Sequence, residues 1–412
     1  MKPLTFLLLH IVGYILVDSC LLEDKMDSCH KMEDTQIIQT FSINEGDTLL
    51  LVKDIDLEKK TFLFPKNVTI KPNGGRFKNG TLIGNHTKIM GMDIMFDMVH
   101  VKGTWNVPVV STELFHNLGY TNSLRDVIAL TSPHMNNKVY IGSGIYVLSL
   151  TKNQETGLPI SSNTDLVIDG TIILKENSFT NYQILEVTGT NVTISGKGTV
   201  CGDRTNHLGN SGEWGMGIRI WAAEKVCIKN IDVIDCWGDC IYIGGNTDNV
   251  EIDNCNLRNS RRQGISITSA KDVVIKNCEI SNIFGTPPQY GIDIEPNKNN
   301  IVEGVKIVNN SIYNCFGGIA IYGKAANAKI GTVSIVDNNI SKCENKSPLS
   351  LIKAKKVLLE RNRLSSTTQS FIRVSGIDSI YIKNNQIDFS NKNPIVTEFN
   401  KFKVYKDNMI KY

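Results

Sequence analysis

The chain has 412 residues, of which 41% are hydrophobic and 21% are charged, and its formal net charge is +3. This near-neutral balance excludes the strongly basic face of a nucleic-acid-binding protein, so we expect no nucleic-acid partner. The length allows a large core, and a single elongated repeat domain can use all of it.

Residues 1–20 are predicted to be a secretory signal peptide. Lys2 supplies a positive charge, and the apolar run from Leu4 to Val17, interrupted by His10, is too short for a transmembrane helix. A buried N-terminal strand is the alternative. Val17-Asp18-Ser19-Cys20 loosely resembles a bacterial lipobox, which would place a lipid on Cys20. We expect an exported protein, secreted, periplasmic or at the cell surface, that touches a membrane only through such an anchor.

Residues 35–150 are predicted to form an N-terminal cap with entry strands. The segments 67–71 and 80–84 are strand-like with glycine turns between them, and 121–130 has helical spacing, with Asn122 or Ser123 as its N-cap. A strand, Lys138 to Val147, follows. The expected role of this cap is to cover the terminal edge of the repeat that comes next.

A repeat of V-x-I-x-N type occupies residues 151–400. Consecutive copies lie 23 residues apart at the tightest, as from Val250 to Val273, and 34 at the longest, from Val192 to Val226. Alternating apolar residues make each copy a strand with one inward face, and a period in the twenties matches one coil of a solenoid. The sequence therefore predicts an all-β fold, a single-stranded right-handed parallel β-helix. Residues 401–412 are a last strand or a tail.

Turn residues and cysteines follow the same repeat. The recurrent asparagine is expected in a buried turn, where stacked amides can hydrogen-bond along the axis. Of the ten cysteines, Cys255 and Cys278 share one slot of the repeat, and Cys236, Cys315 and Cys343 share another. Such stacking predicts small apolar core residues. No CxxC pair is present, and we expect no metal centre.

Each coil has a second strand, and its alternation predicts a column of outward side chains. Aligning the inward isoleucines places in one column Arg219, Tyr242, Ser266, Asp293, Ala320 and Arg373. The next outward column contains Trp221, Gly244, Thr268, Glu295 and Tyr322. On the lip before these strands lie Asp239, Gln263 and Tyr290, with Arg261 and Arg262 directly before Gln263. Asp293 should lie two coils from Asp239, roughly 9–10 Å along the axis.

Acids, arginines and aromatics thus gather on consecutive coils, in what we interpret as a groove for a polysaccharide. Aromatic rings offer flat faces to sugars, and guanidinium groups bind hydroxyls or carboxylates. The candidate catalytic residues are Asp239, Asp293, Glu295 and Tyr290; the candidate substrate-binding residues are Arg261, Arg262, Gln263, Tyr242, Arg219, Trp221 and Tyr322. The alternative is an ordinary solvated surface. His207, in the inserted loop Cys201–Trp214, could reach the groove, but a lone histidine is more typical of ordinary surface.

From about residue 138 to 385 the chain resembles the pectate-lyase-like superfamily of right-handed β-helices. Gly238-Asp-Cys-Ile-Tyr-Ile, followed one coil later by Gln263-Gly-Ile-Ser-Ile, is similar to the Asp-Asp-Cys-Ile and Gly-His-Gly-Ile-Ser-Ile of polygalacturonase-type glycoside hydrolases. Asp239 matches the second aspartate of that motif, while Gly238 and Gln263 replace the first aspartate and the histidine. The family's Asn-x-Asp and Arg-x-Lys have no clear counterpart. This resemblance implies hydrolysis by paired carboxylates.

A second resemblance is to alginate epimerases. Tyr290-Gly-Ile-Asp293 matches the first half of their Tyr-Gly-(Phe/Ile)-Asp-Pro-His motif, and Ile294-Glu295 replaces the Pro-His. It implies removal of the proton next to a uronate carboxylate by a base, an acid and a cation. Tyr290, Asp293, Glu295 and Arg262 would fill these roles, with calcium on Asp293 and Glu295 if the protein is a lyase or epimerase.

Hydrolysis of a glycosidic bond, without a cofactor, is the function that the sequence favours. A polysaccharide lyase or uronate C5-epimerase is one alternative. The other is a non-catalytic glycan-binding β-helix, such as an adhesin or a phage-type spike. The sequence leaves open which polysaccharide is bound and how many copies of the chain assemble.

Overall fold

The computed structural model describes residues 43–116, 119–152, 155–343, 347–366, 372–389, 394–398, 403–406 and 408–411. The chain divides into two compact units, Met1–Tyr140 and Ile141–Tyr412. The predicted signal peptide and its Cys20 lie outside the described residues. Within the described ranges, no helix has the length and apolar character needed to cross a bilayer.

The first unit contains a sheet of parallel strands around an aromatic core. Its order is β1 (Thr48–Leu51), β4 (Thr69–Pro72), β5 (Phe77–Ile89), β6 (Phe96–Asn106) and β8 (Phe115–His116), with β2 (Ile55–Asp56) and β3 (Thr61–Leu63) paired to β5. Phe64, Phe77 and Trp105 are at most 1% exposed, and the Phe64 ring meets the other two edge-on at 6.1 and 6.0 Å. Both strand-like segments predicted here lie in strands, in β4 and β5.

The predicted helix is α1 (Tyr120–Ala129), but its cap differs from the prediction. The N-cap residue is Gly119, with φ of 80° and no capping side chain, and Asn122 and Ser123 lie inside the first turn. The Ser123 hydroxyl donates to the Gly119 carbonyl at 3.1 Å, so it cannot cap an amide from outside the helix. The 3-10 helix η1 (Thr112–Leu114) precedes α1, and β7 (Val109–Ser111) pairs with β9 (Asn137–Ile141). That this unit covers the end of the repeat stays a prediction.

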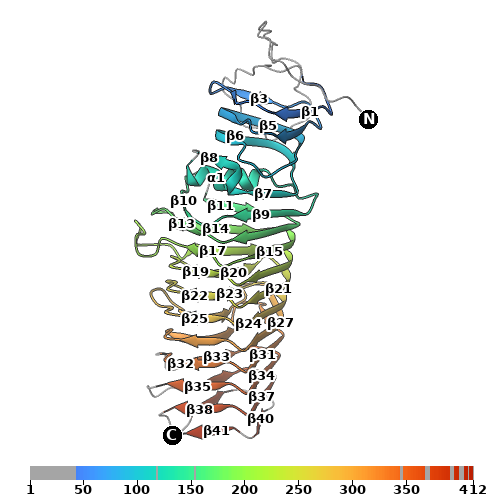
Figure 1. The fold of residues 1–412 in the computed structure, drawn as a ribbon. Helices are drawn as coiled ribbons and strands as arrows, with labels where there is room; N and C mark the ends of the chain where they lie inside the picture. The colour runs from blue at the N-terminus through green and yellow to red at the C-terminus, as the bar shows by residue number, and fades with distance from the viewer. Residues whose placement is uncertain are drawn as a thin grey trace. The chain divides into compact units, whose positions relative to one another are not determined.

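The second unit is a right-handed parallel β-helix, as predicted, with three parallel sheets (Figure 1). Each coil contributes one strand to each sheet in turn. Sheet 1 contains β11 (Thr156–Ile160), β14 (Asn181–Val187), β17 (Trp214–Trp221), β20 (Ile241–Gly244), β23 (Ile265–Ile267), β26 (Tyr290–Ile294), β29 (Gly317–Tyr322), β33 (Leu349–Ile352), β36 (Ile372–Ser375) and β39 (Ile395–Glu398).

Sheets 2 and 3 complete the coils. Sheet 2 contains β12 (Thr164–Ile168), β15 (Thr190–Gly196), β18 (Glu224–Lys229), β21 (Thr247–Asp253), β24 (Ala270–Lys276), β27 (Ile301–Val308), β31 (Thr332–Val336), β34 (Lys356–Glu360), β37 (Ser379–Lys383) and β40 (Lys403–Lys406), and β30 (Lys329–Ile330) pairs with β27. Sheet 3 contains β10 (Ile145–Leu148), β13 (Thr171–Leu174), β16 (Thr199–Cys201), β19 (Asp232–Ile234), β22 (Asn256–Arg258), β25 (Glu279–Ser281), β28 (Ser311–Tyr313), β32 (Asn339–Ser341), β35 (Arg363–Ser366), β38 (Gln386–Phe389) and β41 (Met409–Lys411).

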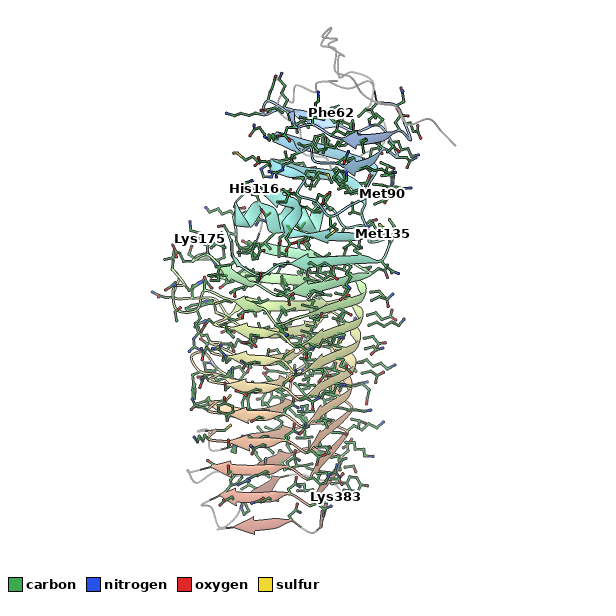
Figure 2. The ribbon with its side chains drawn as sticks, viewed as in Figure 1. Phe62, Met90, His116, Met135, Lys175 and Lys383 are labelled. Atoms are coloured by element: carbon green, nitrogen blue, oxygen red, sulfur yellow. The ribbon has the colours of Figure 1, made fainter. Side chains whose placement is uncertain are left out.

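The V-x-I phrases form sheet 2 with their apolar residues stacked in register. Val226 pairs with Val250, and Val250 with Val273, and all three are at most 2% exposed. Burying one such side chain contributes about 1.5–3 kcal/mol, and the same contact recurs at every coil. Polar side chains point away from this core, as at Lys383 on β37 and Lys175 after β13 (Figure 2).

The prediction that the recurrent asparagines of the repeat form a buried ladder is wrong by one residue along the chain. The repeat asparagines Asn254, Asn277 and Asn309 are exposed, with φ between 52° and 55°. On the surface, the Asn309 amide donates to Asn277 and the Asn254 amide to Asn230. Asparagine tolerates this left-handed conformation, which turns its own side chain outward. The buried amide ladder consists of the residues that follow a turn, Asn310, Asn338, Asn362, Asn385 and the half-buried Asn408.

The stacked cysteines are core residues, as predicted. Cys255 and Cys278 occupy the same inward slot as the ladder, and the Cys278 amide donates to Asn310 Oδ1 at 2.9 Å. Cys236, Cys315 and Cys343 are at most 1% exposed. The eight described cysteines are all free thiols, and the described residues include no cluster of His, Cys, Asp and Glu arranged to hold a metal ion.

We expect native thiol reactivity only at Cys201 and Cys227, the two half-buried cysteines among those described. Burial raises the pKa of both thiols, to about 11 for Cys201, so even these should react slowly near pH 8. Titration with a chromogenic disulfide, with and without denaturant, measures this once Cys20 and Cys29 are replaced by serine. Fast reaction of more than two thiols in the folded protein would contradict the prediction.

Candidate functional site

The strand register of sheet 1 sets the outward column. Arg219 pairs with Tyr242, Tyr242 with Ser266, Ser266 with Asp293, and Asp293 with Ala320, in the order that the sequence predicts. The column then passes through Ser350 to Arg373. The sequence did not predict Ser350 in this column, because the longer loop between β29 and β33 makes the start of the next repeat hard to locate. The column residues of the middle coils therefore lie on neighbouring strands.

Asp293 and Glu295 form a carboxyl pair where β26 ends. Asp293 is 3% exposed, and its Oδ2 accepts a hydrogen bond from Gln263 Nε2 at 2.7 Å. Burial first, and then the charge of Glu295, raise the pKa of Asp293 well above its ordinary range. Two carboxyl groups can hydrogen-bond each other only if one is protonated, and the bond to Glu295 favours the proton on Asp293.

Asp239 is the third carboxyl group, and it is fully buried. Its Oδ2 accepts from the Ser266 hydroxyl at 2.7 Å and lies 3.3 Å from Arg262 Nη1. Arg262 Nε is in turn 3.5 Å from Glu213. Burial raises the pKa of Asp239, and the Arg262 charge and the Ser266 hydrogen bond oppose that rise. Asp239 thus forms an ion pair with the Arg262 guanidinium group.

The coil of β23 supports both aspartates from its two sides. Ser266 donates to Asp239, and Gln263 donates to Asp293 while its Oε1 accepts from the Tyr290 amide at 2.7 Å. The backbones of Asp239 and Asp293 are two coils apart, yet their carboxyl groups both reach this middle coil. The middle coil therefore bridges the two carboxyl groups, and the charge of Asp239 contributes to raising the pKa of Asp293.

Aromatic rings and an arginine extend this face over the neighbouring coils. The Arg219 guanidinium lies 4.4 Å from the Trp221 ring centroid and 3.1 Å from Glu186, and Trp221 stacks near Tyr242 with centroids 6.3 Å apart. Trp221 and Tyr322 are exposed, at 37% and 36%. These rings form an apolar platform open to solvent on both sides of the carboxyl groups.

Three predicted site residues are more enclosed than a substrate contact requires. Tyr290 is 8% exposed, and its hydroxyl donates to the Ser347 carbonyl at 3.5 Å. Gln263 is fully buried. Arg261 donates to the Gly212 carbonyl at 2.7 Å and stacks on the Trp237 ring at 3.8 Å. All three residues stabilise the lip, which consists of the segments that directly precede the strands of sheet 1.

His207 is not a surface residue, and that interpretation is wrong. Its imidazole is fully buried, with Nδ1 2.8 Å from Asp203 Oδ2, and its ring stacks on Trp237 at 4.1 Å. Asp203 also accepts from the Tyr182 hydroxyl and is fully buried, and it is the hydrogen-bond partner that faces His207 Nδ1. The inserted loop folds back onto Trp237, the same ring that Arg261 contacts. The sequence signal for this buried pair is Asp203, an acid that lies four residues before His207.

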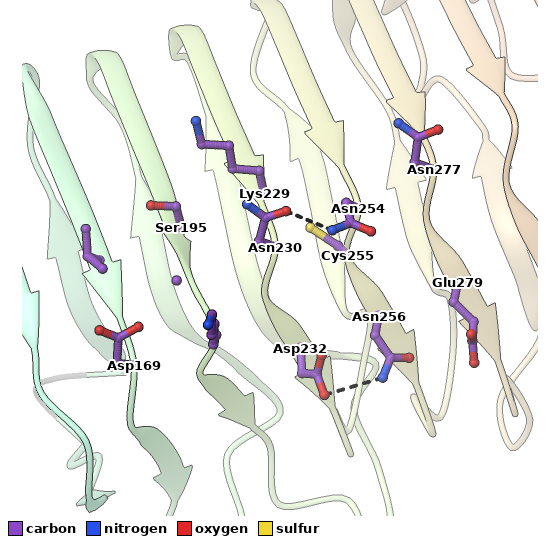
Figure 3. A pocket seen from close by; sticks show the side chains of 13 residues that line it. Asp169, Ser195, Lys229, Asn230, Asp232, Asn254, Cys255, Asn256, Asn277 and Glu279 are labelled. Atoms are coloured by element: carbon purple, nitrogen blue, oxygen red, sulfur yellow. Dashed lines mark hydrogen bonds between the residues drawn. The ribbon is translucent and has the colours of Figure 1, made fainter.

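A hollow of about 850 Å³ lies elsewhere, at the turns between sheets 2 and 3 (Figure 3). It is lined by solvated residues such as Lys229, Asn254 and Glu279, and none of the predicted site residues contributes to it. We place the candidate site on sheet 1 because buried, hydrogen-bonded carboxyl groups with raised pKa values lie there.

Comparisons with known proteins agree with this fold. Residues 148–332 match the right-handed β-helix region family. The uncharacterized protein YclG of Bacillus subtilis (strain 168) is 29% identical over 205 residues, which cover 43% of this chain and 35% of that protein. The SPbeta prophage-derived uncharacterized protein YorA of the same strain is 28% identical over 163 residues, 34% of this chain and 28% of that one. The matches span about a third of these relatives' length.

Two solved structures share the fold at low sequence identity. The A-module of the mannuronan C-5 epimerase AlgE4 of Azotobacter vinelandii has a TM-score of 0.53 and 14% identity, covering 73% of this chain and 95% of that one. The family 28 exopolygalacturonase of Yersinia enterocolitica has a TM-score of 0.50 and 11% identity, covering 75% and 80%. Residues 148–332 thus carry a right-handed β-helix region, and both solved structures share the fold of this chain.

Proposed function

We propose that the protein binds a polysaccharide along the outer face of sheet 1 and hydrolyses its glycosidic bonds. The observation that carries this proposal is Asp293, a buried carboxyl group on the outward face of β26 whose pKa is raised by burial and by Glu295. The fold supports it, since two structures that share it are named for action on mannuronan and on a polygalacturonate chain. Fold alone does not assign a reaction, so the argument rests on the carboxyl groups.

In this mechanism Asp293 donates its proton to the oxygen of the leaving sugar. Gln263 Nε2 holds the carboxyl group in place, and the carboxyl group regains its proton from water after each turnover. The second carboxyl group is Asp239, whose pKa burial raises and whose ionised form Arg262 and Ser266 favour. It would take a proton from the attacking water while it stays paired with Arg262 at 3.3 Å.

The Gln263 amide opposes calcium binding between Asp293 and Glu295. Gln263 Oε1 accepts from the Tyr290 amide, so the amide nitrogen, a donor, faces Asp293 Oδ2 at 2.7 Å. A calcium ion needs six to eight oxygen ligands, and this N–H group uses one of the lone pairs of Asp293 that could bind the ion. We therefore propose a hydrolysis that needs no metal or other cofactor.

A non-catalytic glycan-binding β-helix is the second candidate. The full burial of Asp239 and the enclosure of Tyr290 favour it, because a catalytic group must reach the substrate. The aromatic platform serves binding as well as it serves catalysis.

A screen of neutral and acidic polysaccharides with product analysis tests the proposal. Hydrolysis produces new reducing ends without an unsaturated uronate, and it should continue in the presence of a chelator. An unsaturated product would instead show elimination. Binding without any product would support the glycan-binding module.

Replacing Trp221 by alanine should weaken glycan binding about tenfold, because it removes an exposed ring face on which a sugar can stack. Isothermal titration measures the affinity. The matched control is Tyr381→Ala on sheet 2, since Tyr381 is 39% exposed and has Lys356 over its ring, as Trp221 has Arg219. An equal loss in both variants would argue against binding along sheet 1.

A further inference from the structure

The ionisable groups of the candidate site are rich in acids, and their cations are already engaged. The acids are Glu186, Glu213, Asp239, Asp293 and Glu295, and the cations among them and their direct partners are Arg219, Arg261 and Arg262. Even with Asp293 protonated, four carboxylates face three guanidinium groups.

Each guanidinium group has a fixed partner. Arg219 bonds Glu186 at 3.1 Å and lies over the Trp221 ring. Arg262 lies between Asp239 and Glu213, at 3.3 and 3.5 Å.

Arg261 is committed as well, to the Gly212 carbonyl and the Trp237 ring. A substrate carboxylate could recruit one of these three cations only by displacing a carboxylate or by breaking up the lip. Displacing Asp239 from Arg262 would leave a fully buried charge unpaired, which is costly.

We propose that this site selects a neutral glycan and rejects polyuronates. The inference rests on the proposed function and names its substrate class, in contrast to the uronate polymers in the names of the two solved relatives. A uronate bound at Asp293 would bring its carboxylate close to Glu295, which makes no ion pair with the described residues. The neighbouring cation, Lys324, lies one coil further on, over the Tyr322 ring at 5.1 Å. Like charges at such a distance repel, and elimination or epimerisation would also lack the cation that neutralises the uronate.

The recognition that remains does not require a charge on the substrate. The exposed rings of Trp221 and Tyr322, over which Arg219 and Lys324 lie, can stack on the apolar side of a sugar. Asp293 in its protonated form can donate to a hydroxyl or ring-linking oxygen. A sugar with a primary alcohol in place of the carboxylate keeps both contacts and loses the repulsion.

The test compares one polymer in two charge states. Polygalacturonate and polymannuronate are each measured in native form and after reduction of their carboxyl groups to alcohols, by titration calorimetry at low salt. We expect the reduced polymers to bind at least about tenfold more tightly, and the gap to narrow as salt screens the repulsion. Equal or tighter binding of the native polyuronates overturns the inference and leaves the proposed function standing. No binding of either form, or of neutral glycans, overturns the proposed function itself.

A variant pair separates the local charge from the overall charge. Glu295→Gln should raise the affinity for native polyuronate at least several-fold and reduce its salt dependence. The control is Glu251→Gln on sheet 2, which removes one carboxylate, 3.1 Å from Lys276, on another face of the coil. If folded Glu295→Gln binds polyuronate no better than this control, the carboxyl pair does not set the selection.

Discussion

Asp293→Asn is expected to lower the rate of glycan hydrolysis at least about a hundredfold and to leave glycan affinity within about threefold of the wild type. Asparagine keeps the shape and can still accept from Gln263 Nε2, but it has no proton to give to the leaving oxygen. Release of reducing ends gives the rate, and titration calorimetry gives the affinity. The control is Asp388→Asn, an exposed position on β38.

The same substitution should change the pH dependence of stability. Because the pKa of Asp293 is raised in the folded protein, its contribution is complete below the unfolded value of 3.8 and is lost as pH rises through the folded pKa. An asparagine at this position does not titrate, so the variant does not lose stability in this way as the pH rises. At pH 8 the variant should exceed the wild type in unfolding free energy by on the order of 1 kcal/mol, since one pKa unit corresponds to about 1.4 kcal/mol.

Urea unfolding at pH 4 and pH 8 measures this difference. A variant that is destabilised at pH 8, or that hydrolyses glycan at the wild-type rate, would contradict the assignment of Asp293 as the acid. Loss of hydrolysis together with loss of structure would be seen in the circular dichroism, and the stability comparison separates that case from a catalytic effect.

Asn338→Ala is expected to lower the unfolding free energy by on the order of 3–5 kcal/mol. Asn338 Oδ1 accepts from the amide and the side chain of Asn310, both at 2.9 Å, and its Nδ2 donates to the Ile307 carbonyl at 2.9 Å. Alanine leaves these buried groups without partners, and each unsatisfied group costs about 1–3 kcal/mol. The effect is large because Asn338 is 1% exposed.

The matched control is Asn309→Gly, in the exposed ladder next to Asn310. Glycine accepts the φ of 55° at this position, and only one surface hydrogen bond is lost, to Asn277 at 2.8 Å. Its cost should stay below about 1 kcal/mol. Urea midpoints of the two variants give the comparison, and equal losses would mean that the buried ladder adds no more than the surface one.

The fold and its columns could be predicted because they depend on local periodicity. An isoleucine at every second position marks the inward face of a strand, so Tyr242, Ser266 and Asp293 were aligned from the sequence alone. The buried asparagine ladder was misplaced by one residue because the turn conformation, a positive φ at Asn309, decides which amide points inward.

What the sequence by itself determined is the coil: which residues form strands, which face inward, and which coils carry the acids and aromatics. The tertiary structure alone decided that Asp293 is buried beside Glu295 with a raised pKa, that Asp239 is fully buried against Arg262, and that His207 is enclosed by the inserted loop. The physical reason is that alternation acts between neighbours in the chain. Burial, hydrogen bonding and charge pairing join side chains that lie a coil or more apart, and the turns and loops between them set how those side chains meet.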